Sequence, residues 1–390
     1  MSDSSSCRVC GSHALTGIEG YSDLPRVTSD SRPWSAGGGL FICLECDAIQ
    51  KLPTTKWLSE IGDIYASYNL WPLSNGSEQP IFLSDYAPKP RSELLIDFLR
   101  NQIAIAQKGA LLDIGCGTGA ALANFGNLFP SWSLYAADLS ERALPVLSRI
   151  PGFKTLFTQP LNKINRRFDL VTMIHSLEHF SSPTETLAEV RNLLGTDGVL
   201  LVQVPNGEIS PFDLLVVDHL VHFGPRQLAL SAGRAGLEIR HLRDDFLPKE
   251  LTMVALPGVV SSGEWIAADS WSVKNATKKV QWLHAILDKA NSVADVSHSL
   301  GRPFGIFGSS IAGMWLYGAL QGKVDFFVDE DIARQGSVLD RRPIMNPEDV
   351  PEDAEVFLAL LPETAIRVSQ RMAVSPGRYI LPPSLNLSEN

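Results

Sequence analysis

The sequence predicts an α/β protein whose central part is a parallel, doubly wound sheet. From residue 110 to residue 256, short apolar runs typical of buried strands alternate with segments of helix length, a pattern typical of parallel sheets. A shorter series of the same kind starts near residue 304, and two C-x-x-C pairs lie near the N-terminus. In a chain of 390 residues, these observations predict two or three domains.

The composition narrows the classes of function. The formal net charge is −10, which argues against a broad surface for nucleic acid or an anionic membrane. No apolar run is long enough for a membrane span, and the first residues lack the basic and apolar stretches of a secretory signal. We therefore expect a cytoplasmic protein with reduced thiols and a small-molecule substrate, with neither nucleic acid nor membrane as a partner.

Four of the five cysteines form two C-x-x-C pairs, Cys7/Cys10 and Cys43/Cys46. This spacing lets two thiolates from one turn point at one tetrahedral zinc ion. A redox dithiol would account for one pair but not for two, and unligated thiols are the remaining alternative. We predict a structural zinc ion, because four cysteine ligands leave no position for water activation.

The predicted elements follow in order along the chain. Residues 1–57 contain only short apolar pieces and are expected to form the zinc module. In the connector that follows, Tyr65, Tyr68 and Trp71 either clamp over a site or pack on the next domain. Ser92 is expected to cap a helix that runs to about residue 106. The main series contains predicted strands at 110–115, 133–138, 167–174, 199–205, 237–242 and 251–256, and predicted helices at 119–129, 140–150 (capped by Ser140), 183–194 and 225–236. A helix at 261–300 precedes the second series, which contains 304–308, a helix with Trp315, 324–331 and 355–362.

A glycine-rich turn, Asp113-Ile-Gly-Cys-Gly-Thr-Gly119, follows the first strand of the main series and opens a helix. The glycines allow a tight turn and a close approach of the backbone to a ligand. Asp113 would repel a phosphate but suits an ammonium group, and Asp138 ends the next strand, where a carboxylate can accept hydrogen bonds from two ribose hydroxyls. Together they favour S-adenosylmethionine over NAD. A structural turn without a ligand is the alternative.

Two histidine pairs lie where predicted strands end: His175-Ser-Leu-Glu-His179, and Asp218-His-Leu-Val-His222, which contains His219. In open α/β sheets, ligands bind outside the carboxyl ends of the strands. Histidine suits proton removal near neutral pH. We expect at least one of these histidines to contact the substrate, while others only pack or form local hydrogen bonds.

The segments D-I-G-C-G-T-G, A-A-D and F-D-L-V-T-M-I-H-S-L-E-H resemble the class I S-adenosylmethionine-dependent methyltransferases, over about residues 94–256. The resemblance implies a Rossmann-like core and S-adenosyl-L-methionine as cofactor. One departure is the adenine region, where an acid is usual and this chain has Phe157-Thr-Gln-Pro160; Thr158 or Gln159 is left to supply a polar contact. The expected cofactor-binding residues are Asp113, Gly115, Cys116, Gly117, Gly119, Asp138, Leu139 and His175.

The order of the parts resembles the sugar C-methyltransferases of deoxysugar biosynthesis. That resemblance implies a zinc module with its connector at 1–70, a methyltransferase core at 71–258 and a C-terminal Rossmann-like α/β domain at 259–390. It also implies a nucleotide-linked keto-deoxysugar substrate, which loses a proton beside the ketone and is methylated at the enolate carbon. His222 matches the family's base, His179 a second active-site histidine and Tyr68 a substrate-contacting tyrosine, with His219 in the same loop.

This chain departs from that family at Val221, where a glutamate is expected. Glu178 or Asp218 is left to compensate, and the departure favours O-methylation of a hydroxyl as an alternative. A polyketide-like acceptor and a non-catalytic, cofactor-binding partner protein are further alternatives. In the C-terminal part, residues 308–313 and Asp329 hint at a second nucleotide site without the tight G-x-G turn. The preferred interpretation is a lid, either structural or substrate-holding; a substrate-holding lid would grip a nucleotide diphosphate with Arg341 or Arg342.

Overall fold

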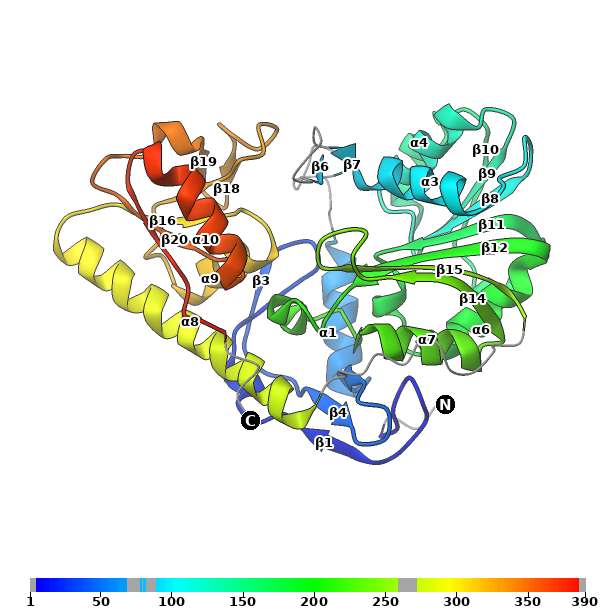
Figure 1. Ribbon diagram of the computed structural model, residues 1–390, viewed down its shortest axis with the longest axis horizontal. Helices are drawn as coiled ribbons and strands as arrows, with labels where there is room; N and C mark the ends of the chain where they lie inside the picture. Colours follow the sequence, from blue (N-terminus) through cyan, green and yellow to red (C-terminus); the bar gives the residue numbers. More distant parts are fainter. Residues whose placement is uncertain (1–4, 69–77, 79, 82–88, 259–271, 386–390) are drawn as a thin grey trace.

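The computed structural model describes residues 5–68, 78, 80–81, 89–258 and 272–385. Three sheets form its framework: a seven-stranded central sheet, a six-stranded C-terminal sheet and a four-stranded N-terminal sheet. Figure 1 shows the central and C-terminal sheets on opposite sides of the molecule, with the N-terminal segment, in blue, running between and beneath them.

The central sheet has the strand order β10-β9-β8-β11-β12-β15-β14. The first five strands are parallel, whereas β15 runs antiparallel to β12 and β14 antiparallel to β15. Every residue of β8 is buried, as expected for a strand covered on both faces. The strands are β8 (Ala110–Ile114), β9 (Ser133–Ala137), β10 (Phe153–Phe157), β11 (Phe168–Ile174), β12 (Leu194–Pro205), β14 (Leu237–Arg243) and β15 (Glu250–Pro257). The six predicted strands are confirmed, whereas β10 was not predicted.

Helices cover both faces of this sheet, and two of their predicted starts were wrong. Ser92 does not cap α3, because the helix begins at Arg91 after Pro90, and the Ser92 hydroxyl donates to Glu78. Ser140 makes no capping bond; residues 141–147 form a 3₁₀ turn (η2, Glu141–Ala143) and one α-turn (α5, Leu144–Leu147), because Pro145 has no N–H to continue a helix. The other helices are α3 (Arg91–Gln102), α4 (Ala120–Leu128), α6 (Pro183–Leu193) and α7 (Pro225–Arg234).

The N-terminal sheet combines strands from two distant parts of the chain. Its order is β1-β4-β5-β13, and β13 comes from the loop after β12. In the β13–β5 pair, His222 lies opposite Ile49 and Val221 opposite Gln50. The elements are β1 (Leu15–Gly17), β4 (Phe41–Cys43), β5 (Ile49–Gln50) and β13 (Val221–His222), followed in sequence after β5 by α1 (Thr55–Ala66). The second histidine loop is thus part of the N-terminal sheet.

The C-terminal sheet follows a long helix, α8 (Val273–Ser299), and has the order β18-β19-β17-β16-β20-β21. The fully buried Trp315 on α9 donates its indole N–H to the carbonyl of Pro25, which ties this unit to the N-terminal segment. No helix in the described ranges is long and apolar enough to cross a membrane. The remaining elements are β2 (Arg26–Val27), β3 (Pro33–Trp34), β6 (Pro80–Ile81), β7 (Lys89–Pro90), β16 (Phe304–Phe307), α9 (Ile311–Ala319), β17 (Phe326–Val328), β18 (Val338–Leu339), β19 (Arg342–Met345), β20 (Glu355–Leu358), α10 (Pro362–Arg371) and β21 (Arg378–Ile380).

Candidate functional site

The glycine-rich turn joins β8 to α4 at the carboxyl end of the central sheet. Gly115, Gly117 and Gly119 have φ values of 75°, 52° and 78°, in the left-handed region that favours glycine. A Cβ atom on Gly115 would lie 2.5 Å from the Cβ of Ser176, and one on Gly119 would lie 2.5 Å from Leu147 Cδ2. The glycines therefore also make room for two neighbouring segments of the protein.

Two carboxylates lie beside this turn. Asp113, at the end of β8, is buried and accepts a 2.7 Å hydrogen bond from the Thr172 hydroxyl; burial raises its pKa to about 7. Asp138 follows the adjacent strand β9 and is half-buried, with an oxygen 3.8 Å from the sulfur of Cys116. Leu139, the next residue, is exposed. The two acids thus end neighbouring strands, as the sequence predicted.

The region expected to contact the adenine lies at the end of β10. β10 ends at Phe157, whose carbonyl accepts from the N–H of Asp138. The side-chain amide of Gln159 donates to the carbonyl of Lys163 and is therefore engaged within its own loop.

His175 directly follows β11 beside the glycine turn, with a φ of 50° that is uncommon for a residue other than glycine. Its Nε2 lies 3.3 Å from Glu250 and its Nδ1 lies 3.5 Å from Glu178. Burial and the nearby Arg91 lower the pKa of His175, but these two carboxylates outweigh them and raise the pKa to about 9. His175 is thus held between two acids.

His179 lies on the short 3₁₀ turn Leu177–His179 and contacts the aromatic connector. Its Nδ1 donates a 2.9 Å hydrogen bond to the backbone carbonyl of Asp218 and lies 3.1 Å from the hydroxyl of Tyr65. The hydroxyls of Tyr68 and Ser29 lie 3.1 Å apart, and the backbone N–H and hydroxyl of Ser29 both donate to the Asp218 carboxylate. The N-terminal segment therefore helps to orient this loop.

In the described part of the connector, the ring of Tyr65 meets the ring of His179 edge to face. The guanidinium of Arg142 donates to the backbone carbonyls of Ala66 and Tyr68 at the end of α1, and so links the connector to the loop after β9. This geometry agrees with the clamp interpretation. Trp71 lies outside the described residues.

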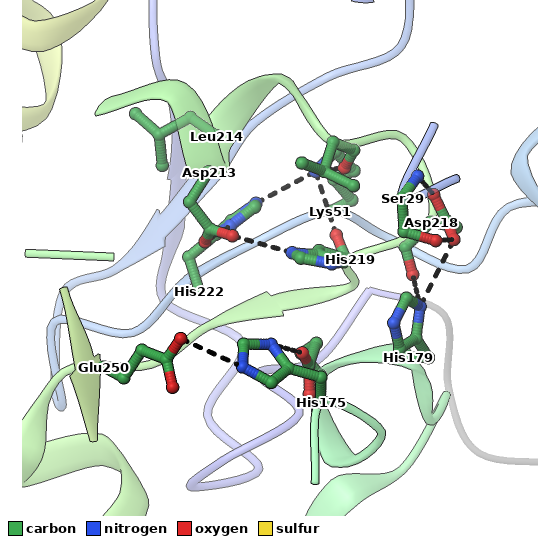
Figure 2. Close-up of polar contacts among 12 residues, drawn as sticks. Ser29, Lys51, His175, His179, Asp213, Leu214, Asp218, His219, His222 and Glu250 are labelled. Carbon is green, nitrogen blue, oxygen red and sulfur yellow. Dashed lines mark hydrogen bonds and ion pairs between the residues drawn. The ribbon is translucent and has the colours of Figure 1, made fainter. Parts of the chain in front are cut away.

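His219 and His222 share one buried carboxylate, Asp213 (Figure 2). The Nδ1 of His219 donates to one oxygen of Asp213 over 2.7 Å, and the Nδ1 of His222 donates to the other over 2.6 Å. The Nε2 of His222 accepts a 2.9 Å hydrogen bond from the ammonium of Lys51, which also donates to the carbonyls of Val216 and His219. His222 is fully buried, and both of its ring nitrogens are engaged.

The charges in this network support that hydrogen-bond pattern. Burial and the positive charge of Lys51 lower the pKa of His222 to about 4, so the ring is neutral near pH 7. Burial also lowers the pKa of Lys51 to about 7, with Asp213 opposing the shift. Burial alone would raise the pKa of Asp213, but the two imidazoles outweigh it and hold the pKa below its usual range. Among the three residues, Asp213 is the anion that orients the others.

Glu178 lies next to these histidines in the interior. Its exposed fraction is 1%, and neither carboxylate oxygen accepts a hydrogen bond from the residues that the structure describes. One of its oxygens, one nitrogen of His179 and one nitrogen of His219 all lie within 4.8 Å of one another. The rings of His179 and His219 meet edge to face, with centroids 4.7 Å apart.

The four paired cysteines form a separate cluster. The sulfur atoms lie 3.6 Å apart in the Cys7/Cys46 pair and 3.5 Å apart in the Cys10/Cys43 pair, and all four lie within 4.8 Å of one another. These separations exceed a disulfide bond. The backbone N–H groups of Val9 and Cys10 point at the sulfur of Cys7. The cluster has the donor chemistry of a tetrahedral zinc site.

Several residues of the site could not be recognised from the sequence. Ser29 and Lys51 come from the N-terminal segment, and Asp213 comes from the 3₁₀ turn Pro211–Leu215. Tyr65 was noted only as part of the connector. No local motif marks these positions, although Asp213 is an acid within the apolar stretch 211–217, nine residues before His222.

The fold and the glycine turn together are those of α/β proteins in which ligands bind at the carboxyl edge of the central sheet. The sequence profile of a family described as a methyltransferase domain matches residues 89–242. A relative, the malonyl-acyl-carrier protein O-methyltransferase of Halalkalibacterium halodurans, is 23% identical over 204 residues, which cover 50% of this chain and 70% of the relative. The chain is an S-adenosylmethionine-dependent methyltransferase.

Similar solved structures include the cyclase SpnF, with a TM-score of 0.40 and 16% identity over 53% of this chain and 97% of that one. Another is CalO1, a methyltransferase in calicheamicin biosynthesis with SAH bound, with a TM-score of 0.34 and 16% identity. That match covers 41% of this chain and about half of CalO1, 52%.

Proposed function

We propose that this methyltransferase acts on a nucleotide-linked keto-deoxysugar and methylates it at carbon. The observation that carries the proposal is the histidine and carboxylate cluster beside the glycine turn, which is assembled from the central sheet and the N-terminal segment. Such a cluster suits the removal of a proton from the acceptor before methyl transfer. The N-terminal cysteine module and the C-terminal α/β unit agree with the resemblance to sugar C-methyltransferases.

The cofactor residues belong to the same proposal. Asp113 receives the ammonium group of S-adenosylmethionine, and Asp138 receives the ribose hydroxyls. Gly115, Gly117 and Gly119 let the backbone approach the cofactor, while Cys116 packs beneath the turn. Leu139, exposed next to Asp138, covers the adenine, and His175 lies at the edge of the cofactor site.

Within the cluster, the geometry changes the expected roles of the histidines. His222 has no free ring nitrogen, so we assign it a positioning role instead of the role of base. His179 and His219 each use Nδ1 as a donor, so Nε2 of both rings has no hydrogen-bond partner among the described residues and can serve the acceptor site. Tyr68 is proposed to contact the sugar from the connector.

O-methylation of a hydroxyl is the second candidate. Val221 is buried and pairs with Gln50, so no carboxylate occupies the position where the sugar family has a glutamate. The relative from Halalkalibacterium halodurans is an O-methyltransferase. Removal of a hydroxyl proton needs only one nearby base.

The proposal also assigns roles to the cysteine module and to the C-terminal unit. Structural zinc binds Cys7, Cys10, Cys43 and Cys46 and stabilises the module that supplies Lys51 and Ser29. The C-terminal unit acts as a lid on the nucleotide diphosphate. A cytoplasmic location would keep the four thiols reduced.

The test is an assay with S-adenosylmethionine and a thymidine diphosphate-linked keto-deoxysugar in deuterated water. Carbon methylation predicts exchange of the proton beside the ketone even without cofactor, because enolate formation precedes methyl transfer. A methyl ether formed without exchange would favour the O-methyl alternative. If neither product forms and no exchange occurs with a panel of such sugars, the sugar proposal is wrong.

A further inference from the structure

We propose that Glu178, His179 and His219 bind a divalent metal cation beside the methyl-acceptor site. One ligand atom of each residue lies within 4.8 Å of the other two, a separation that allows all three to reach one ion. This cation would be distinct from the zinc proposed for the four cysteines. The inference rests on the proposed function only for its view of where the acceptor binds.

The hydrogen bonds of the two histidines favour metal binding. The Nδ1 of His179 donates to the carbonyl of Asp218, and the Nδ1 of His219 donates to the carboxylate of Asp213. These bonds select the tautomer in which Nε2 carries the free electron pair. Metal-binding histidines almost always donate their other ring N–H to a carboxylate or a backbone carbonyl. Both histidines therefore already have the surroundings of metal ligands.

Glu178 provides an independent observation. The carboxylate is 1% exposed and accepts no hydrogen bond from any described residue. His175 forms an ion pair with Glu178 through Nδ1 at 3.5 Å and with Glu250 through Nε2 at 3.3 Å, so one imidazolium charge is shared between two acids. A buried carboxylate without hydrogen-bond donors is costly, and a cation would compensate it.

The ligand set indicates the kind of ion. Two imidazole nitrogens and one carboxylate oxygen suit Mn²⁺, Fe²⁺, Co²⁺ or Zn²⁺, and three protein ligands leave coordination positions open. Oxygen atoms of the acceptor would fill those positions. A cation there would hold a keto or hydroxyl oxygen and lower the pKa of the proton to be removed.

The experiment uses the full chain, stripped by mild chelation and then checked for retained zinc. Mn²⁺ is added in steps, and the signal of the unbound Mn²⁺ is measured by electron paramagnetic resonance. We expect one Mn²⁺ per chain outside the cysteine cluster. Glu178→Gln and His219→Ala should weaken binding at least about 10-fold, the loss seen even when supporting residues of a metal site are changed.

The matched control is His298→Ala, which removes an exposed histidine paired with Asp325 and far from the cluster in sequence; it should bind Mn²⁺ as the unchanged protein does. Asp213→Asn supplies a second test, because it disturbs the tautomer of His219 without removing a ligand, and it too should weaken binding.

Circular dichroism confirms that each variant is folded. Equal Mn²⁺ affinity in the unchanged protein and the folded Glu178→Gln variant overturns the inference. Methyl transfer without Mn²⁺ binding would leave the proposed function standing; Mn²⁺ binding without transfer to any sugar would count against the proposed function alone.

Discussion

His179, His219 and His222 lie in two short motifs, yet their neighbours give them different chemistry. His222 is enclosed by Lys51 and Asp213, whereas His179 and His219 each keep one nitrogen without a hydrogen-bond partner in the described part of the chain. A histidine's tautomer depends on what its other nitrogen contacts. The residue type alone therefore did not identify which ring can act on the acceptor.

Asp113 should make cofactor binding depend on pH. Its pKa is raised from 3.8 to about 7 by burial, so the carboxyl is partly protonated near pH 7 when no cofactor is bound. The ammonium of the cofactor favours the ionised form, so binding should release a proton below pH 7, and affinity should rise as pH increases to about 7. Without cofactor, stability should fall as pH rises from 3.8 to about 7, because the unfolded chain loses this proton first.

Calorimetry of S-adenosylhomocysteine binding in buffers of different ionisation enthalpy measures this proton release. Asp113→Asn should abolish it. A proton release that persists in the folded variant would assign the titration to another group.

Asp138 provides a second prediction at the residue scale. Asp138→Ala should weaken S-adenosylhomocysteine binding by about 1–3 kcal/mol, because the ribose hydroxyls lose their acceptor. Calorimetry measures the change. Glu141→Ala, at an exposed acid three residues further on, serves as the control. Unchanged affinity in Asp138→Ala would mean that the ribose lies elsewhere.

At the scale of elements, the cysteine cluster and the second histidine loop are coupled through one small sheet. Cys43 ends β4, β4 pairs with β5, and β5 pairs with β13, which carries His222. Lys51 follows β5 directly and contacts His222. Loss of order in the cysteine module should therefore also disturb the positions of Lys51 and His222 at the acceptor site.

Cys43→Ser should lose zinc, lower the melting temperature and reduce methyl transfer together. Structural zinc is coupled to folding, so loss of one thiolate removes stabilisation from the module. Metal analysis and thermal unfolding measure the first two effects. Cys116→Ser should retain its zinc, since this cysteine is not part of the cluster. Metal-free protein with an unchanged melting temperature would contradict the prediction.

At the scale of the whole molecule, the N-terminal segment lies between two α/β units and contributes side chains that pack or form hydrogen bonds with both. One core cluster contains Leu24 and Val27 together with Trp282 and Trp315 from the C-terminal unit. Tyr21 donates to the carbonyl of Leu214, next to Asp213. The site is therefore held by a core that joins distant parts of the chain.

Trp315→Ala should destabilise the protein by about 3–5 kcal/mol, since a fully buried tryptophan leaves a large cavity and Pro25 loses its donor. The shift of the urea unfolding midpoint measures the loss. Ile332→Ala, at an exposed position of the same unit, should change it little. An equal effect of the two substitutions would contradict the view that Trp315 anchors the N-terminal segment.

The sequence by itself determined most of the strand and helix series, the glycine turn with Asp113 and Asp138, and the grouping of the four cysteines. The strands and helices depend on patterns within a few residues, and the glycine turn depends on positive φ values. The cysteine pairs depend on a spacing that one turn imposes. Only the tertiary structure decided how the acceptor site is built. Lys51 reaches His222 across 171 positions, and Ser29 reaches Asp218 across 189. Hydrogen bonds between such distant residues arise from sheet pairing and packing, which no local pattern encodes, and they decide which histidine nitrogens remain free.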